Sequence, residues 1–116
     1  GFVQGAGWLT TEELWWDDKG ALRTHSPSTY KIPVSSDVPE AFHVQIWKGG
    51  KNREKTIHRS KAVGEPPLML AISVHSAINQ AIASTFEGHA LPDLDAPATP
   101  ERILMCLTAL AGKRSE

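Results

Sequence analysis

The chain of 116 residues contains a single cysteine, Cys106, and lacks any hydrophobic run long enough to cross a membrane. A lone cysteine cannot form an internal disulfide, and unpaired thiols are typical of proteins in a reducing compartment. A membrane-spanning helix needs about 20 consecutive apolar residues, and no charged segment leads into an apolar one as in a secretory signal. Hydrophobic residues nevertheless make up 41% of the chain. The sequence therefore predicts a soluble, cytoplasmic protein with a packed core and no membrane partner.

An excess of charge of either sign is also missing. The chain has 12 basic and 13 acidic residues, for a net charge of -1, whereas domains that bind nucleic acid usually carry a basic face. The one basic cluster, KGGKNREK at residues 48–55, also holds Glu54 and two glycines. We interpret it as a solvated loop and expect no nucleic-acid partner.

The residue clusters that build a metal centre or a nucleophilic site are absent from the sequence as well. No HxH or HxxxH pair occurs, and a metal site made by the protein would need clustered nitrogen and sulfur ligands. There is no GxSxG or GxGxxG motif. Cys106 lies among apolar residues, which is typical of a core position. The histidines are therefore expected to be surface or hydrogen-bonded side chains: His25, His43, His58, His75 and His89.

In its first half the sequence predicts one helix and several strand-like runs. Residues 1–13 are typical of a glycine-rich helix, in which each interior glycine costs about 1 kcal/mol. ELWW (13–16) and ALRT (21–24) flank DDKG and predict a hairpin. Residues 25–40 contain three prolines and predict an ordered loop, whereas FHVQIW (42–47) alternates and predicts a strand.

Two further helices are expected in the second half. Residues 67–84 carry apolar side chains at helical spacing. Thr99 is a typical N-cap, Pro100 suits the first turn and Glu101 suits the helix dipole, and residues 112–114 provide a conventional end. The chain is therefore expected to have an α+β fold, with a small antiparallel sheet or hairpin and about three helices. The stripe predicted to be buried on 67–84 consists of Leu70, Val74, Ala77, Ile78, Ala81 and Ile82.

Glu65 lies between Gly64 and the pair Pro66-Pro67, directly before the apolar helix. A carboxylate at a helix N-terminus is stabilised by the dipole, so Glu65 can be read as a simple helix start. Capping residues are normally Ser, Thr, Asp or Asn, however. Glycine allows another group to approach the backbone, and two prolines fix the turn. A rigidly held carboxylate is what general-base chemistry requires, so both interpretations remain open from the residues alone.

Four stretches, taken together in this order, resemble a known family. SKAVGEPPLMLAISV (60–74) is similar to the signature of the molybdenum hydroxylases. GWLTTEEL (7–14), STYKIP (28–33) and DAPATPERIL (95–104) resemble the C-terminal part of the molybdopterin-binding subunit of bacterial xanthine dehydrogenases. The resemblance implies that residues 1–116 are the C-terminal part of a larger molybdopterin-binding domain, truncated at its N-terminal side.

The chemistry that this resemblance implies is specific. Glu65 would act as general base on a hydroxide bound to molybdenum, which attacks an electron-poor carbon of hypoxanthine or xanthine and leads to urate, while hydride passes to a sulfido ligand. The metal is held by the dithiolene of molybdopterin, so no metal ligand is expected from this chain, and Gly64 would lie near the cofactor. Electrons would leave through [2Fe-2S] clusters and FAD to NAD.

The same resemblance implies partners outside the chain. These are the rest of the molybdopterin-binding subunit, an iron–sulfur and FAD subunit, and the purine, whose binding residues lie in earlier segments. The isolated fragment is therefore expected to hold no cofactor, to be inactive and to self-associate through Trp8, Trp15 and Trp16. His75 and Ser76 depart from the bulky apolar residues usual in the family.

Two alternatives stay open at this point. The same scaffold could act on an aldehyde or another aromatic heterocycle. The chain could also be a non-catalytic interaction domain, in which GEPP is only a helix start.

Overall fold

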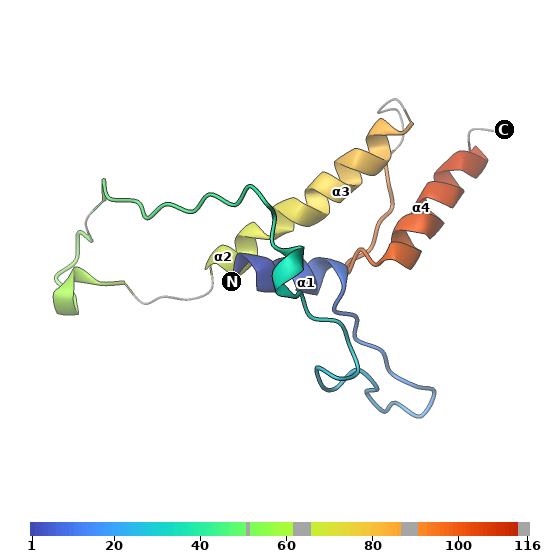
Figure 1. The fold of residues 1–116 in the computed structure, drawn as a ribbon, viewed down its shortest axis with the longest axis horizontal. Helices are drawn as coiled ribbons and strands as arrows, with labels where there is room; N and C mark the ends of the chain where they lie inside the picture. The colour runs from blue at the N-terminus through green and yellow to red at the C-terminus, as the bar shows by residue number, and fades with distance from the viewer. Residues whose placement is uncertain (51, 62–65, 87–90, 114–116) are drawn as a thin grey trace.

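The computed structural model describes residues 1–50, 52–61, 66–86 and 91–113 (Figure 1). In this part of the chain the regular structure is helical. The elements are α1 (Phe2–Thr10), α2 (Pro66–Leu70), α3 (Ile72–Ser84) and α4 (Pro100–Lys113), with short 3₁₀ turns at Ser35–Asp37 and Ile57–Arg59. None of the helices in the described ranges is long and apolar enough to cross a membrane.

The expected α+β fold is wrong, because the described residues form no strand, sheet or hairpin. Around residues 13–24 the antiparallel pairing is limited to one isolated bridge between Trp16 and Leu22. The carboxylate of Asp17 accepts the backbone N–H groups of Lys19 and Ala21, each at 2.9 Å. These side-chain hydrogen bonds shape a local turn, but a turn without further cross-strand pairs does not make two strands.

The second expected strand, residues 42–47, has no regular structure and no pairing, and its backbone runs as a drawn-out trace (Figure 1). No hydrogen bond joins the backbone of residues 39–50 to another residue that the structure describes. Alternating β formers favour a strand only when a partner is available, since most of what is measured as β propensity is packing against neighbours. The pattern in the sequence carries no information on where that partner lies.

The helix expected at residues 67–84 is divided into α2 and α3 at Ala71, which is completely buried. The helix expected after residue 99 is confirmed as α4. Its N-cap is Thr99, as predicted: the backbone N–H of Arg102 donates to Thr99 Oγ1 at 3.3 Å, and that of Ile103 donates to the Thr99 carbonyl at 2.9 Å. Such a cap satisfies N–H groups that the first turn leaves without partners.

The principal core lies between α3 and α4, which run side by side in Figure 1. It is built on Ile82, Cys106 and Leu110, which are 4 to 7% exposed. Cys106 is thus confirmed as a core residue. The predicted stripe on residues 67–84 is only partly buried, since Ile82 is covered whereas Leu70 is 65% exposed. The partly buried residues that pack around this core are Ile78, Phe86, Leu94, Ile103 and Leu107.

The molecule is much more extended than its length requires. Its radius of gyration is 18.9 Å, whereas a compact domain of this length has about 13 Å. Its accessible surface is 9714 Å², against about 6,200 Å² expected for a folded monomer of this mass. Residues 40–50 and 52–61, here called the arm, project away from the helices (Figure 1).

Candidate functional site

The two residues singled out by the sequence, Gly64 and Glu65, lie outside the described residues. What the structure describes is α2, the helix that follows them in the sequence. α2 begins at Pro66, immediately after Glu65, and its position is fixed by contact with α1. The residues that make this contact therefore determine where the GEPP turn is attached.

Glycines on one face of α1 allow α2 to approach the bare helix backbone. Gly5 is buried, and a Cβ atom placed there would lie 2.5 Å from the carbonyl oxygen of Leu68 and 2.7 Å from Cβ of Ala71. A Cβ atom on Gly1 would lie 3.0 Å from Cβ of Pro67. Contacts shorter than van der Waals separation force a packed structure to shift. Gly5 is therefore required by the packing of α2, and not by backbone dihedral angles.

A second bare face of α1 receives the STYKIP stretch. A Cβ atom on the buried Gly7 would lie 2.5 Å from Cδ of Pro33. At the end of the helix the hydroxyl of Thr11 donates to the carbonyl of Lys31 at 3.1 Å. Residues two apart on a helix point in nearly opposite directions. STYKIP and the helix after GEPP therefore lie on different sides of α1.

The C-terminal end of α1 holds the DAPATPERIL stretch. The N–H of Ala98, which is 2% exposed, donates to the carbonyl of Leu9 at 2.7 Å. Nearby, Arg102 of α4 pairs with Glu13 at 2.8 Å. α1 thus contacts all three of the other stretches that carried the resemblance. The glycines of this helix are expected from the sequence only to weaken it. The i, i+4 spacing of Gly1 and Gly5 is the signal in the sequence that indicates the contact with α2.

Two carboxylates near this site have shifted pKa values. Burial raises the pKa of Glu12, whose Oε1 lies 2.6 Å from the position of a Cβ atom on Gly7. The pKa of Asp17 is lowered, first by the backbone N–H of Ala21, with further contributions from Arg23 and the N–H of Lys19. Arg23 Nε donates to Asp17 Oδ2 at 2.7 Å. Asp17 therefore serves the local turn, whereas Glu12 belongs to the surroundings of α1.

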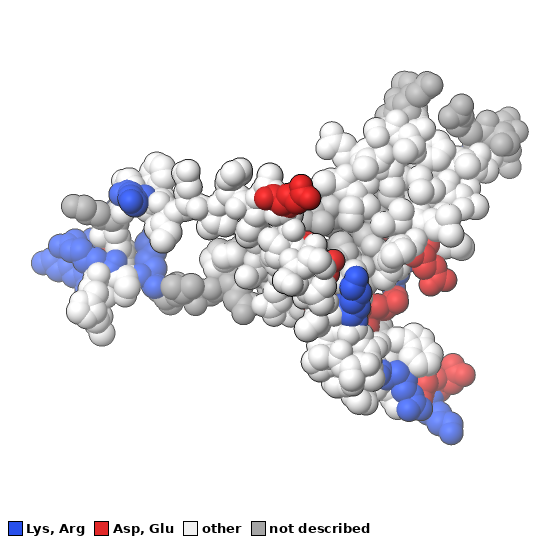
Figure 2. Space-filling model, viewed as in Figure 1, with Lys and Arg blue, Asp and Glu red and all other residues white. Residues whose placement is uncertain are grey.

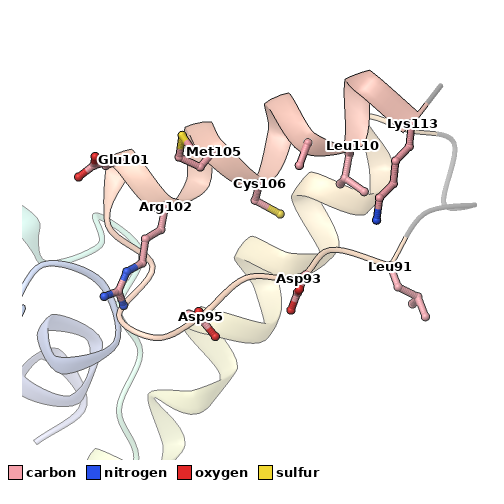
Figure 3. Close-up of a pocket in the computed structure, with 10 residues that line it drawn as sticks. Leu91, Asp93, Asp95, Glu101, Arg102, Met105, Cys106, Leu110 and Lys113 are labelled. Atoms are coloured by element: carbon pink, nitrogen blue, oxygen red, sulfur yellow. The ribbon is translucent and has the colours of Figure 1, made fainter. Parts of the chain in front are cut away.

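A groove away from α1 lies between α4 and residues 91–95 (Figure 3). It encloses about 510 Å³. Asp93 and Asp95 line one side, and Arg102 and Lys113 lie toward the two ends of α4. In the described ranges no group of three or more His, Cys, Asp or Glu side chains could hold a metal ion. This groove therefore offers charge but no set of metal ligands.

Comparison with known proteins identifies the stretches around this site. The family model described as "Molybdopterin cofactor-binding domain" matches residues 1–39, which include α1 and STYKIP. The chain is 48% identical over 114 residues to "Xanthine dehydrogenase 1" of Arabidopsis thaliana, covering 90% of this chain and 8% of that protein.

Other relatives agree. "Xanthine dehydrogenase" of Oryza sativa subsp. japonica is 48% identical over 125 residues, covering 97% of the chain and 9% of the relative. "Xanthine dehydrogenase/oxidase" of Gallus gallus is 49% identical over 105 residues, covering 88% and 8%. The chain therefore spans less than a tenth of the length of these relatives, and the resemblance stated from the four stretches is confirmed.

Proposed function

Because the chain belongs to the molybdenum hydroxylase family, we propose that it forms one wall of the molybdenum active site in an enzyme that oxidises hypoxanthine and xanthine to urate. In this proposal residues 1–116 are the C-terminal part of the molybdopterin-binding domain. The observation that carries it is the convergence of the family-like stretches on α1. Relatives that are 46 to 50% identical are named as xanthine dehydrogenases, which favours a purine over an aldehyde as substrate.

The described residues fit a position beside the cofactor and not around it. The gap at Gly5 is already filled by Leu68, so it leaves no room for a pterin. The described residues also offer no set of side-chain metal ligands, which is compatible with a metal held by an organic group. The molybdenum–molybdopterin group, when bound, supplies the oxygen donor and accepts two electrons from the substrate.

The role proposed for Glu65 is that of general base. Its carboxylate would accept the proton of the attacking oxygen, while Gly64 would leave room for the cofactor at the same turn. Support comes from the next residue, Pro66, which begins α2. α2 packs closely against α1 at Gly1 and Gly5. A base must stay within hydrogen-bond reach of the proton that it removes, so a tightly packed α2 serves this role.

The electron path and partners are part of the same proposal. Electrons would pass through [2Fe-2S] clusters and FAD to NAD in other domains or subunits. The isolated chain is then expected to bind no molybdenum and to form no urate.

The test is the Glu65→Ala substitution in the full-length enzyme, with urate formation from xanthine and molybdenum content measured together. Loss of a general base lowers turnover by about 100- to 10,000-fold, with molybdenum retained. Glu54→Ala, at an exposed position of the arm, is the matched control and should leave turnover unchanged. Unchanged turnover in Glu65→Ala would return this residue to a simple helix start, as in a non-catalytic interaction domain.

A further inference from the structure

The arm carries large apolar side chains that nothing in the described structure covers. Val44 is 74% exposed, Ile46 is 86% exposed and Trp47 is 82% exposed. Only the base of this segment is anchored, where the ring of Phe42 lies 5.7 Å from that of Phe2 in α1. Single exposed apolar residues are normal on protein surfaces, but a contiguous exposed run marks an interaction site.

The backbone of the same segment has free hydrogen-bonding capacity. Residues 42–47 run as a drawn-out trace without helical turns (Figure 1) and, among the described residues, have no backbone partner. In an extended chain successive side chains point to opposite faces. In that conformation Phe42, Val44 and Ile46 share one apolar face, whereas His43, Gln45 and Trp47 lie on the other. An extended segment with unpaired N–H and C=O groups can add to the edge of a sheet. Its backbone then pairs with the edge strand, and its alternate side chains pack against the sheet.

The exposed area of the chain and the charge of the arm indicate the size and the chemistry of the partner. The chain exposes roughly 3,500 Å² more than a folded monomer of its mass, and a stable interface buries about 1,600 Å² in total. Beyond the apolar segment, lysine and arginine gather at the far end of the arm (Figure 2). The exposed cations there are Lys48, Arg53, Lys55, Arg59 and Lys61.

We propose that residues 42–47 add as a strand to the edge of a β-sheet in the remainder of the full-length enzyme, beside acidic side chains that receive the basic end of the arm. The inference rests on the proposed function for the identity of that polypeptide. The relatives are more than ten times as long as this chain, so ample polypeptide exists to supply the sheet. The fold of the chain itself is unaffected, because its described residues make no sheet of their own.

A strand addition differs from docking by side chains alone in what it does to backbone amides. Pairing with one neighbour protects every second N–H of the added strand, whereas insertion of side chains into a groove leaves the N–H groups in water. The two arrangements can therefore be separated by hydrogen exchange.

The experiment measures exchange at single-residue resolution for amides 43–47 in the full-length enzyme. We expect every second amide of this segment to exchange at least about 100-fold more slowly than in an unstructured peptide of the same sequence. Exchange at the unstructured rate throughout the segment would overturn the proposal. Protection that disappears when the enzyme is diluted would identify a second copy as the partner, and would also overturn it.

Matched substitutions test the assignment of the faces. Ile46→Asp places a charge on the apolar face and should abolish the protection of its neighbours, whereas Gln45→Asp on the other face should preserve it. Equal effects of the two would contradict the assignment. The outcome is independent of catalysis: an arm that exchanges freely in an enzyme whose turnover depends on Glu65 removes this inference alone, whereas a protected arm in an enzyme that does not oxidise purines removes only the proposed function.

Discussion

Two regions of the chain differ in how they treat apolar surface. One is the contact between α1 and α2, which is closely packed, and the other is the arm, which is exposed. At Gly5 the two helices approach until no Cβ atom fits between them. In the arm, Ile46 and Trp47 keep more than four fifths of their surface in water. The contact between α1 and α2 is specified by residues within the chain. In the arm, the apolar side chains and the backbone groups have no partners among the described residues.

This difference teaches that an apolar pattern and a packed structure are separate properties. Hydrophobic burial contributes roughly 25 cal/mol per Å² only where the surface is actually removed from water. The helical part of the chain obtains that contribution from its own residues, whereas the arm does not. Substitutions in the two regions should therefore change the stability of the isolated chain very differently.

The largest effect is expected at the core between α3 and α4. Leu110→Ala should lower the free energy of unfolding by about 2 to 3 kcal/mol, because it removes buried methyl groups and leaves a cavity. Leu104→Ala on the same helix is the control, since Leu104 is 63% exposed, and it should change stability by less than about 0.5 kcal/mol. Urea unfolding followed by circular dichroism measures both, and similar losses would contradict the packing described.

Next in size is the glycine contact itself. Gly5→Ala should destabilise the chain by about 1 to 3 kcal/mol, because a methyl group there meets the Leu68 carbonyl. Gly112→Ala in α4 meets nothing within 4 Å and should stabilise by up to about 0.5 kcal/mol through helix propensity. Thermal unfolding of the two variants should therefore shift in opposite directions, and a shift in the same direction would remove the close approach as an explanation.

The arm gives the contrasting result. Ile46→Ala should change the unfolding free energy of the isolated chain by less than about 0.5 kcal/mol, although it removes as much side chain as a costly core substitution. The reason is that Ile46 is 86% exposed. A loss comparable to that of Leu110→Ala would mean that the arm is packed in the isolated chain, and would erase the comparison.

The smallest effect concerns Glu12 and depends on pH. Burial raises its pKa above the ordinary value of 4.5 in the folded chain. Ionisation is therefore penalised by folding, so this contribution to stability is full below pH 4.5 and is lost as the pH rises through the folded pKa. Glu12→Gln should stabilise the chain at pH 7 by less than about 0.5 kcal/mol and have no effect at pH 3. Unfolding of Glu12→Gln and of the unsubstituted chain at pH 3 and pH 7 measures the difference.

Local features of the fold could be read from the sequence. The N-cap at Thr99, the helix that follows it and the core position of Cys106 depend on residues close to one another in the chain or on simple hydrophobicity. The strand at 42–47 and the hairpin at 13–24 were wrong in the described structure, because pairing depends on a distant partner. The role of Gly5 was missed, since its contact with Leu68 joins residues far apart in the sequence.

For the candidate site, too, some features could be predicted from the sequence and others could not. The family, with its specific stretches, could be identified from the sequence, and the comparisons confirm it. The roles of Gly64 and Glu65 remain predictions, because these residues lie outside the described part of the chain. What the structure adds is the contact of α2, the helix that follows these residues in the sequence, with the glycine face of α1.

The two glycine faces of α1 allow α2 and Pro33 to approach the helix backbone from different sides, so α1 separates them by the smallest distance that a helix permits. Its Cα atoms lie on a cylinder of radius about 2.3 Å, and with bare positions at Gly5 and Gly7 little more than backbone separates α2 from Pro33. A methyl group on either side would widen the separation between the GEPP and STYKIP stretches. Misplacement of a reacting group by about 1 Å can cost about 100-fold in rate, so under the proposed function the width of this helix would limit how far the reacting groups can shift.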